Sequence, residues 1–240
     1  MRRLKIDMPF PIPAQERYVP YDMMLNDIGF WYPILKRSGV NTPRTIIINS
    51  YDEKFFPVRE ISEAMFKIGF PCFFRGGNIA SSLKHQWDKT CFIKEPIFGN
   101  DIAVRCQKIL KHCIDGNDGA EPLLYDYWAV REYIDCKTVG IYRDMPLKKE
   151  VRVFIKNNKV DCIHNYWNEQ IPKGVVVFTE KELELINSEA SKVAKYFYGY
   201  WSCDFMLGIN GIWYAIDMAL GEDSFHQKGC NKLKQESLIV

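Results

Sequence analysis

The sequence of 240 residues lacks the patterns that mark several common protein classes. Its eight cysteines are scattered, with no Cys-x-x-Cys pair, so a zinc ribbon or a thioredoxin-type redox motif is disfavoured. His85, His164 and His226 lie far apart and show no zinc-ligand spacing. Most of the cysteines fall within apolar segments, where a reduced thiol behaves as a small hydrophobic side chain.

Long apolar runs and a strong charge bias are also missing. A membrane-spanning helix needs about 18 or more consecutive apolar residues, and the sequence has no such run. Residues 1–7 lack the apolar core of a signal peptide, so we expect a cytoplasmic protein without membrane contact. With 32 basic and 30 acidic residues the formal net charge is +2, and contact with nucleic acid would require a local basic patch.

Hydrophobic periodicity and turn residues predict an α+β fold. The apolar content of 47% is ample for a core. Antiparallel hairpins are expected where apolar runs flank Asn-Asn or Asn-Gly pairs. Helices are expected at about residues 21–36, 57–68, 100–112 and 179–197, and strands at 45–48, 72–75, 91–94, 128–134, 151–155, 160–164, 201–207 and 212–217.

The last of these hairpins carries two acids in apolar strands. Antiparallel pairing can bring Asp204 and Asp217 into register. Two buried acids are costly unless a positive charge lies near them. Mg²⁺ is the obvious candidate, since it binds through one or two carboxylates together with substrate phosphates. Glu222 follows a glycine. Its carboxylate either reaches the same metal or is only a side chain on a loop.

A group of cations in the first half of the sequence fits phosphate binding. Arg75 and Lys94 each end a short apolar strand, and a loop of glycine and serine leads from Arg75 to Lys84. Cations neutralise phosphate oxygens, small residues let backbone N–H groups approach, and the Ser82 hydroxyl adds a donor. Each cation could equally be a surface charge at a strand end. The loop is not a P-loop, because the G-x-x-x-x-G-K-[ST] pattern is absent.

The segment around residue 132 suits an adenine-binding hinge. Glu132, Tyr133 and Ile134 end an apolar strand, and their backbone groups can bind the edge of a base. Asp135 lies just beyond, where a carboxylate can bind ribose hydroxyls. The alternative is a strand on which Arg131 and Glu132 simply face solvent.

Arg152 lies on a strand, two positions after Glu150 and on the same face. The two side chains could pair with each other, or Arg152 could bind a phosphate or a substrate carboxylate. A hydrolase triad is disfavoured, because the sequence has no G-x-S-x-G elbow.

Taken in order, these motifs resemble the ATP-grasp superfamily. The resemblance extends over about residues 72–223 and is greatest to the branch that has Arg in place of the first nucleotide-binding Lys. That branch includes the cell-division-cycle protein that helps to assemble translation initiation factor two, and RNA-ligase-like proteins. The resemblance implies two α+β subdomains with antiparallel sheets that clasp a nucleotide cleft. The expected divisions are an N-terminal region of uncertain fold (1–70), a small subdomain (71–125) and a C-terminal subdomain with the hinge and the metal hairpin (126–240).

The resemblance also implies a role for each candidate residue. Arg75 takes the position of the first phosphate-binding Lys, and Lys84 lies in or beside the mobile loop over the triphosphate. Arg152 contacts the γ-phosphate or an acyl phosphate. The implied sets are Arg152 and Lys84 for catalysis; Arg75, Ser82, Lys84, Lys94, Glu132, Tyr133, Ile134 and Asp135 for the nucleotide; and Asp204, Asp217 and Glu222 for Mg²⁺.

Enzymes of this superfamily use ATP to phosphorylate a carboxylate, which a nucleophile then attacks. We therefore predict an ATP-dependent ligase that uses ATP and Mg²⁺ and acts on a carboxylate of a protein, a peptide or a small molecule. One residue departs from the usual metal motif, since Ala219 stands where an Asn is expected. That departure leaves open an ATP-binding assembly factor for a protein partner. An RNA-ligase-like enzyme is a third alternative, which the near-neutral charge does not favour.

Overall fold

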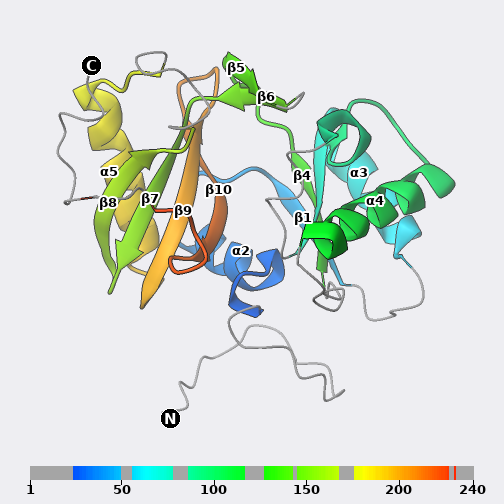
Figure 1. Ribbon diagram of the computed structural model, residues 1–240, viewed down its shortest axis with the longest axis horizontal. Coiled ribbons are helices and arrows are strands. Elements are labelled where there is room, and N and C mark those ends of the chain that lie inside the picture. Colours follow the sequence, from blue (N-terminus) through cyan, green and yellow to red (C-terminus); the bar gives the residue numbers. More distant parts are fainter. Residues whose placement is uncertain are drawn as a thin grey trace, which may run out of the picture.

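The computed structural model describes residues 24–49, 56–77, 86–116, 127–142, 145–167, 176–226 and 230, with the backbone alone for 110–116. They form two lobes, each built on a four-stranded antiparallel sheet (Figure 1). A two-stranded sheet of β5 (Thr138–Tyr142) and β6 (Met145–Lys148) lies between the lobes at the top of that view. The fold is α+β, as the sequence predicts. No helix within these ranges is long and apolar enough to cross a membrane.

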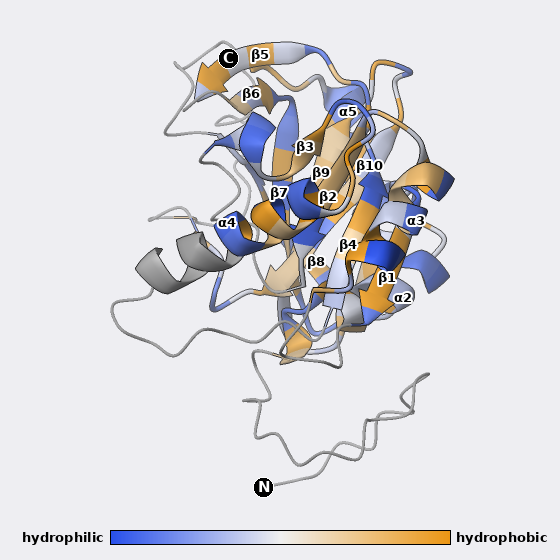
Figure 2. Ribbon diagram, turned by 90° about the vertical axis from the view of Figure 1, so that its right-hand side faces the viewer, coloured by the Kyte–Doolittle hydropathy of each residue, from blue (hydrophilic) through white to orange (hydrophobic). Residues whose placement is uncertain are grey.

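The small lobe, at the right of Figure 1, is a sheet with two helices packed on one face. Its elements are β1 (Thr45–Asn49), α3 (Val58–Ile68), β2 (Cys72–Gly76), β3 (Phe92–Ile93), α4 (Asn100–Gly116) and β4 (Tyr127–Glu132). The strand order is β1-β4-β2-β3. Phe74 and Trp128 point toward the helices and stack on each other. Figure 2 shows the apolar colouring on these strands and hydrophilic colouring on outward parts of α3 and α4.

Helix α3 forms where the sequence predicts it because its apolar residues share one face. Ile61, Ala64, Met65 and Ile68 are all buried against the sheet, at the spacing of three and four residues that an amphipathic helix requires. The helix ends at Gly69, whose φ of 94° is disfavoured for other residues.

The large lobe, at the left of Figure 1, is a second sheet with helices on one face. Its elements are α2 (Ile28–Arg37), β7 (Glu150–Lys156), β8 (Lys159–Asn165), α5 (Glu180–Ala194), β9 (Tyr200–Leu207) and β10 (Trp213–Leu220). The strand order is β10-β9-β7-β8, so β8 lies at an edge. Helix α5 begins with a capping box, in which Thr179 and Glu182 exchange hydrogen bonds. Its residues Leu183, Ile186 and Ala190 are buried against the sheet.

The two hairpins of the large lobe confirm the turn predictions. Between β7 and β8, Asn157 and Asn158 have φ values of 50° and 63°, as a two-residue hairpin turn requires. Between β9 and β10 the connection is longer than a two-residue turn and comprises residues 208–212. Gly211 has the expected positive φ, 77°.

Strand β4 connects the two lobes through its alternating side chains. Trp128 and Val130 belong to the core of the small lobe, whereas Ala129 belongs to the core of the large lobe. The strand pairs with β1 on one side and β2 on the other. The sheet of the small lobe contains strands from each of the three expected regions, 1–70, 71–125 and 126–240. Strands β5 and β6 were not among the predicted elements.

Candidate functional site

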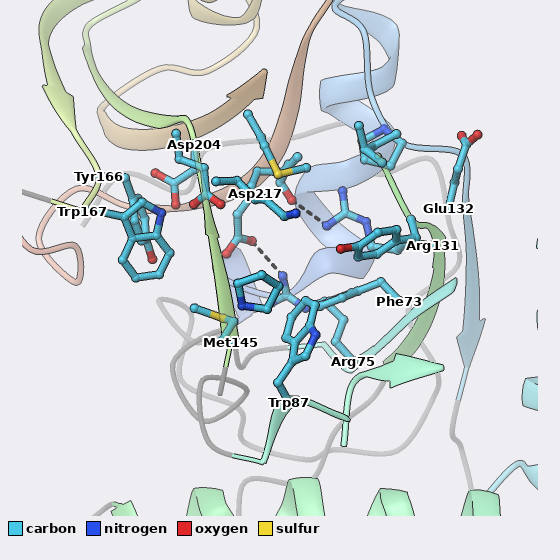
Figure 3. Close-up of a pocket in the computed structure, with 18 residues that line it drawn as sticks. Phe73, Arg75, Trp87, Arg131, Glu132, Met145, Tyr166, Trp167, Asp204 and Asp217 are labelled. Carbon is cyan, nitrogen blue, oxygen red and sulfur yellow. Dashed lines mark hydrogen bonds and ion pairs between the residues drawn. The ribbon is translucent and has the colours of Figure 1, made fainter. Parts of the chain in front are cut away.

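A pocket lies between the lobes, against the sheet faces that the helices leave uncovered (Figure 3). Strands β2 and β4 line it from the small lobe, and β6, β7, β9 and β10 line it from the opposite side. The segment after β4, with Tyr133 and Ile134, also lines the pocket. Charged side chains from both lobes meet within it, as Figure 3 shows for Arg75, Arg131 and Asp217.

Asp204 of β9 and Asp217 of β10 lie opposite each other in the large sheet. The pairing shifts between Ala215 and Asp217, which makes Ile216 an extra residue in the strand. This β-bulge keeps Asp217 on the same face as Asp204, and both side chains line the pocket. The expected meeting of the two acids is confirmed. Two like charges at opposed positions repel each other, so neighbouring cations are needed.

The cation beside Asp217 is Arg75, which comes from the other lobe. Its Nη1 donates to Asp217 Oδ1 over 2.9 Å, and the side chain is almost fully buried. Its Nε and Nη2 donate to the carbonyls of Gly76 and Gly77. Asp217 Oδ1 also accepts from the backbone N–H of Met218. This ion pair therefore joins the two lobes across the pocket (Figure 3).

The cation beside Asp204 is Arg152, which lies opposite it on β7. Nε and Nη2 of Arg152 donate to the two oxygens of Asp204, each over 2.8 Å, in a bidentate ion pair. The guanidinium also lies 4.6 Å from the centre of the Tyr166 ring. Burial lowers the pKa of Arg152, but the interaction with Asp204 is stronger and raises the pKa above its ordinary value. Arg152 therefore pairs with Asp204 across the strands, so Arg75 and Arg152 each hold one of the two acids.

Arg131 is a site residue that the sequence analysis did not single out. Its side chain is buried, and burial lowers its pKa to about 10, with a further lowering by the charge of Arg75. Nη1 donates to the carbonyl of Ile216, the bulged residue, over 2.5 Å, and Nε donates to Thr45. Nη2 is buried and has no hydrogen-bond partner among the described residues. A buried guanidinium with an unsatisfied donor is suited to an anionic ligand.

Lys148 on β6 is a second site residue that the sequence analysis missed. It lines the pocket, although it is largely buried. Nζ donates to the carbonyl of Cys136 over 2.9 Å and to Thr138 over 3.0 Å. An ammonium group has three donors, so one has no acceptor among the described residues and could bind a ligand. The sequence analysis did not identify Lys148 as a site residue because it lies in β6, a strand that the sequence did not predict.

One part of the pocket is apolar. Phe73 and Trp87 pack together with ring centres 5.5 Å apart, and both line the pocket. Ile134, Met145 and Met206 line it as well. Flat apolar surfaces next to a run of backbone groups are suited to a nucleobase.

The remaining expected residues lie partly inside and partly outside the pocket. Glu132, Tyr133 and Ile134 line it, but Asp135 is exposed and does not. Lys94 and Glu222 are also exposed and outside the lining. Lys94 lies outside the pocket because β3 ends one residue before it. Glu222 lies outside because β10 ends at Leu220 and Gly221 separates Glu222 from the strand. Ser82 and Lys84 lie outside the described residues.

Comparison with known proteins gives matches among solved structures. No protein-family model matches the sequence, and no curated protein matches it. The structure of Cdc123 from Schizosaccharomyces pombe matches with a TM-score of 0.54 at 11% identity, over 84% of this chain and 86% of that chain. The biotin carboxylase domain of 2-oxoglutarate carboxylase from Hydrogenobacter thermophilus, in complex with MgADP, matches with a TM-score of 0.55 at 14% identity, over 82% of this chain and 40% of that chain. D-alanine–D-alanine ligase from Bacillus anthracis, in complex with ATP, matches with a TM-score of 0.50 at 14% identity, over 82% and 54% of the two chains.

The chain has the ATP-grasp fold. It spans about half the length of the ligase and less than half of the carboxylase chain, whereas it covers most of Cdc123. Within the ATP-grasp fold of this chain, Arg75 and Arg131 come from the small lobe, and Asp204 and Asp217 come from the large lobe.

Proposed function

We propose that the chain binds ATP with Mg²⁺ in the pocket between its lobes. The observation that carries the proposal is that Arg75 and Arg131 line the pocket together with the in-register pair Asp204 and Asp217, while Arg152, which is outside the lining, holds Asp204. A triphosphate carries enough negative charge to satisfy several guanidinium groups at once. It would also give Arg131 Nη2 the acceptor that it lacks among the described residues.

Asp204 and Asp217 are the proposed Mg²⁺ ligands. Asp217 Oδ1 accepts from Arg75 and Met218, whereas Oδ2 has no hydrogen-bond partner among the described residues. One or two carboxylates are enough for Mg²⁺, because phosphate oxygens and water complete its shell. The ion would supply positive charge to the phosphates, and Arg75 and Arg152 would hold the acids in place.

The proposed base-binding part of the pocket is its apolar end. The backbone of Tyr133 and Ile134 is the proposed hinge, and Met206 from the large lobe lines the same pocket. The N–H of Glu132 already donates to the carbonyl of Arg44 over 2.7 Å, so the groups offered to the base come from the residues after it. Lys148 lies near the same end and has one donor left for a phosphate or a base nitrogen.

The proposed reaction is ligation through an acyl phosphate. An oxygen of the acceptor carboxylate attacks the γ-phosphorus, and ADP leaves. A nucleophile then attacks the carbonyl carbon of the acyl phosphate and releases inorganic phosphate. Arg75 and Arg131 would hold the phosphates in line and neutralise their charge, and Arg152 would act through Asp204.

Isothermal titration calorimetry with ATP and Mg²⁺ tests the binding step. We compare the wild type with Asp217→Asn and, as a control, with Glu184→Gln, whose side chain is exposed on α5. The wild type and the control are expected to bind equally, and Asp217→Asn at least about tenfold more weakly, a loss of about 1.4 kcal/mol. Thermal unfolding confirms that each variant is folded. No binding by the wild type, or equal binding by Asp217→Asn, contradicts the proposal.

A second candidate function is an ATP-dependent assembly factor for a protein partner. It is favoured by the match to Cdc123, which covers most of both chains, and by Ala219 in the metal motif. The two candidates differ in the step after ATP binding. Release of ADP and phosphate only when a carboxylate acceptor is added supports the ligase. A stable complex of the ATP-bound chain with a protein, without turnover, supports the assembly factor, and release of AMP points instead to adenylyl transfer, as in RNA ligation.

A further inference from the structure

Two cysteines and two histidines gather on the large sheet, outside the nucleotide pocket. Cys162 and His164 lie on β8, two residues apart and therefore on the same face. His226 and Cys230 lie in the segment beyond β10. The four ligand atoms, two Sγ and two imidazole nitrogens, all lie within 4.8 Å of one another.

We propose that these four side chains bind one Zn²⁺ ion in a structural site. The Cys162 Sγ lies 3.1 Å from Nε2 of both His164 and His226, and Cys230 Sγ lies 3.3 Å from Nε2 of His164. Zn²⁺ binds sulfur at about 2.3 Å and nitrogen at about 2.0–2.1 Å in a tetrahedron, so neighbouring ligand atoms are about 3.3–3.8 Å apart. The observed spacing is close to that of a tetrahedral site.

Hydrogen bonds alone do not account for this convergence. An imidazole nitrogen carries either one proton or one lone pair, so it makes one good hydrogen bond. Nε2 of His164 nevertheless has two sulfur atoms at contact distance, and Cys162 Sγ has two such nitrogens. A cation between the four atoms would bond to all of them at once.

The charge of the site also fits its surroundings. Two thiolates and two neutral imidazoles around Zn²⁺ have no net charge, which suits a place where Cys162 is buried and the other three residues are half-buried. All four positions of the tetrahedron are filled by protein, as in structural rather than catalytic zinc sites. The site would hold His226 and Cys230 against β8, the strand at the edge of the described sheet.

The packing around His226 supports this role. Its ring lies edge-on to Phe154 of β7, with ring centres 4.3 Å apart, and next to the ring of His164 at 5.0 Å. These contacts place the His226 side chain against the sheet. Sequence spacing gave no sign of the cluster, because Cys162 and His226 are 64 positions apart and meet only through the sheet.

Metal analysis of the purified full chain, without nucleotide, tests the proposal independently of ATP binding. The variants are the double substitution Cys162→Ser with Cys230→Ser, the single substitution His226→Asn, and the control Cys106→Ala, a buried cysteine of the other lobe. One zinc per chain is expected in the wild type and the control, and a background level in the double variant. A wild type without zinc, or a double variant that keeps it, overturns the proposal.

Cobalt reconstitution of the wild type decides the question even if the double variant does not fold. The chain is stripped of metal under reducing conditions and titrated with Co²⁺. A tetrahedral site with two thiolates gives intense visible d–d bands and sulfur-to-cobalt charge-transfer bands, which saturate at one ion per chain and are displaced by Zn²⁺. Absence of these bands overturns the proposal.

Discussion

Asp217 lies directly opposite Asp204 because β10 contains one residue more than regular pairing requires. If β10 paired regularly through Ile216, without the bulge, Asp217 would lie opposite Cys203 and would point into the core, since a one-residue shift moves a side chain to the other face. The bulge also presents the carbonyl of Ile216 to Arg131. The bulge thus determines two features of the pocket, the position of Asp217 and the acceptor for Arg131. Bulges are common beside functional sites.

Arg75 is expected to contribute strongly to ATP affinity. A charge-assisted hydrogen bond contributes about 1.5–3 kcal/mol, so Arg75→Met should raise the Kd for ATP by about tenfold or more. Calorimetry with ATP and Mg²⁺ measures the change. Arg59→Met is the matched control, because Arg59 is highly exposed on α3, where it pairs with Glu63. An equal loss of ATP affinity in Arg75→Met and Arg59→Met would show that the effect is not specific to the pocket.

Arg131 should affect stability and binding in different ways. Replacing this buried cation with Met removes an unsatisfied donor and a desolvated charge, although the carbonyl of Ile216 loses a partner. We expect the free energy of unfolding to change by no more than about 1 kcal/mol, while ATP binding weakens about tenfold or more. Urea unfolding and calorimetry measure the two quantities. A variant that loses several kcal/mol of stability would mean that Arg131 is a structural residue.

The pair of Arg152 and Asp204 should behave as one unit. Removing one partner of a largely buried ion pair leaves the other uncompensated, at a cost of about 3–5 kcal/mol. Arg152→Met and Asp204→Asn should each destabilise the chain, and the double variant should be more stable than the sum of the two losses predicts. Urea unfolding of the four proteins gives the coupling energy. Strict additivity would show that the two side chains act independently.

Glu182 should make the stability of the large lobe depend on pH. Burial opposes its ionisation, but hydrogen bonds from Lys149 and Thr179 outweigh burial and lower its pKa in the folded chain. A carboxyl group with a lowered pKa stabilises the fold above its unfolded pKa of about 4.3, and that contribution is lost as the pH falls through the folded value. Glu182→Gln should be less stable than the wild type by about 1 kcal/mol at pH 7. The difference should shrink at acidic pH in urea titrations, and a constant difference would contradict this account.

Local signals in the sequence were enough for most elements of the fold. Asn157-Asn158, Asn210-Gly211 and the helix end at Gly69 predicted turns and boundaries because these residues tolerate positive φ. Helix α5 was predicted from its apolar face and its acidic first turn. The short strands β5 and β6 were missed, since Pro146 and Gly140 weaken the alternation that identifies a strand.

The site was predictable only where its residues are near each other in the sequence. Asp204 and Asp217 are joined by a hairpin, so the sequence places them near each other, although their direct opposition depends on the bulge at Ile216. Arg131 could not be identified, because its burial depends on β4 lying between β1 and β2, a pairing between distant segments. The partner of Arg152 was also open in the sequence, which offered Glu150, whereas the sheet places Asp204 directly across from it.

The alternating side chains of β4 have a consequence for how the chain unfolds. Trp128 and Val130 belong to one core and Ala129 to the other, so loss of this strand would remove side chains from both cores at once. The two lobes are therefore expected to melt together, in one calorimetric transition whose van't Hoff and calorimetric enthalpies agree. A fragment that ends before residue 127 would lack the central strand of its own sheet, and it should not fold alone.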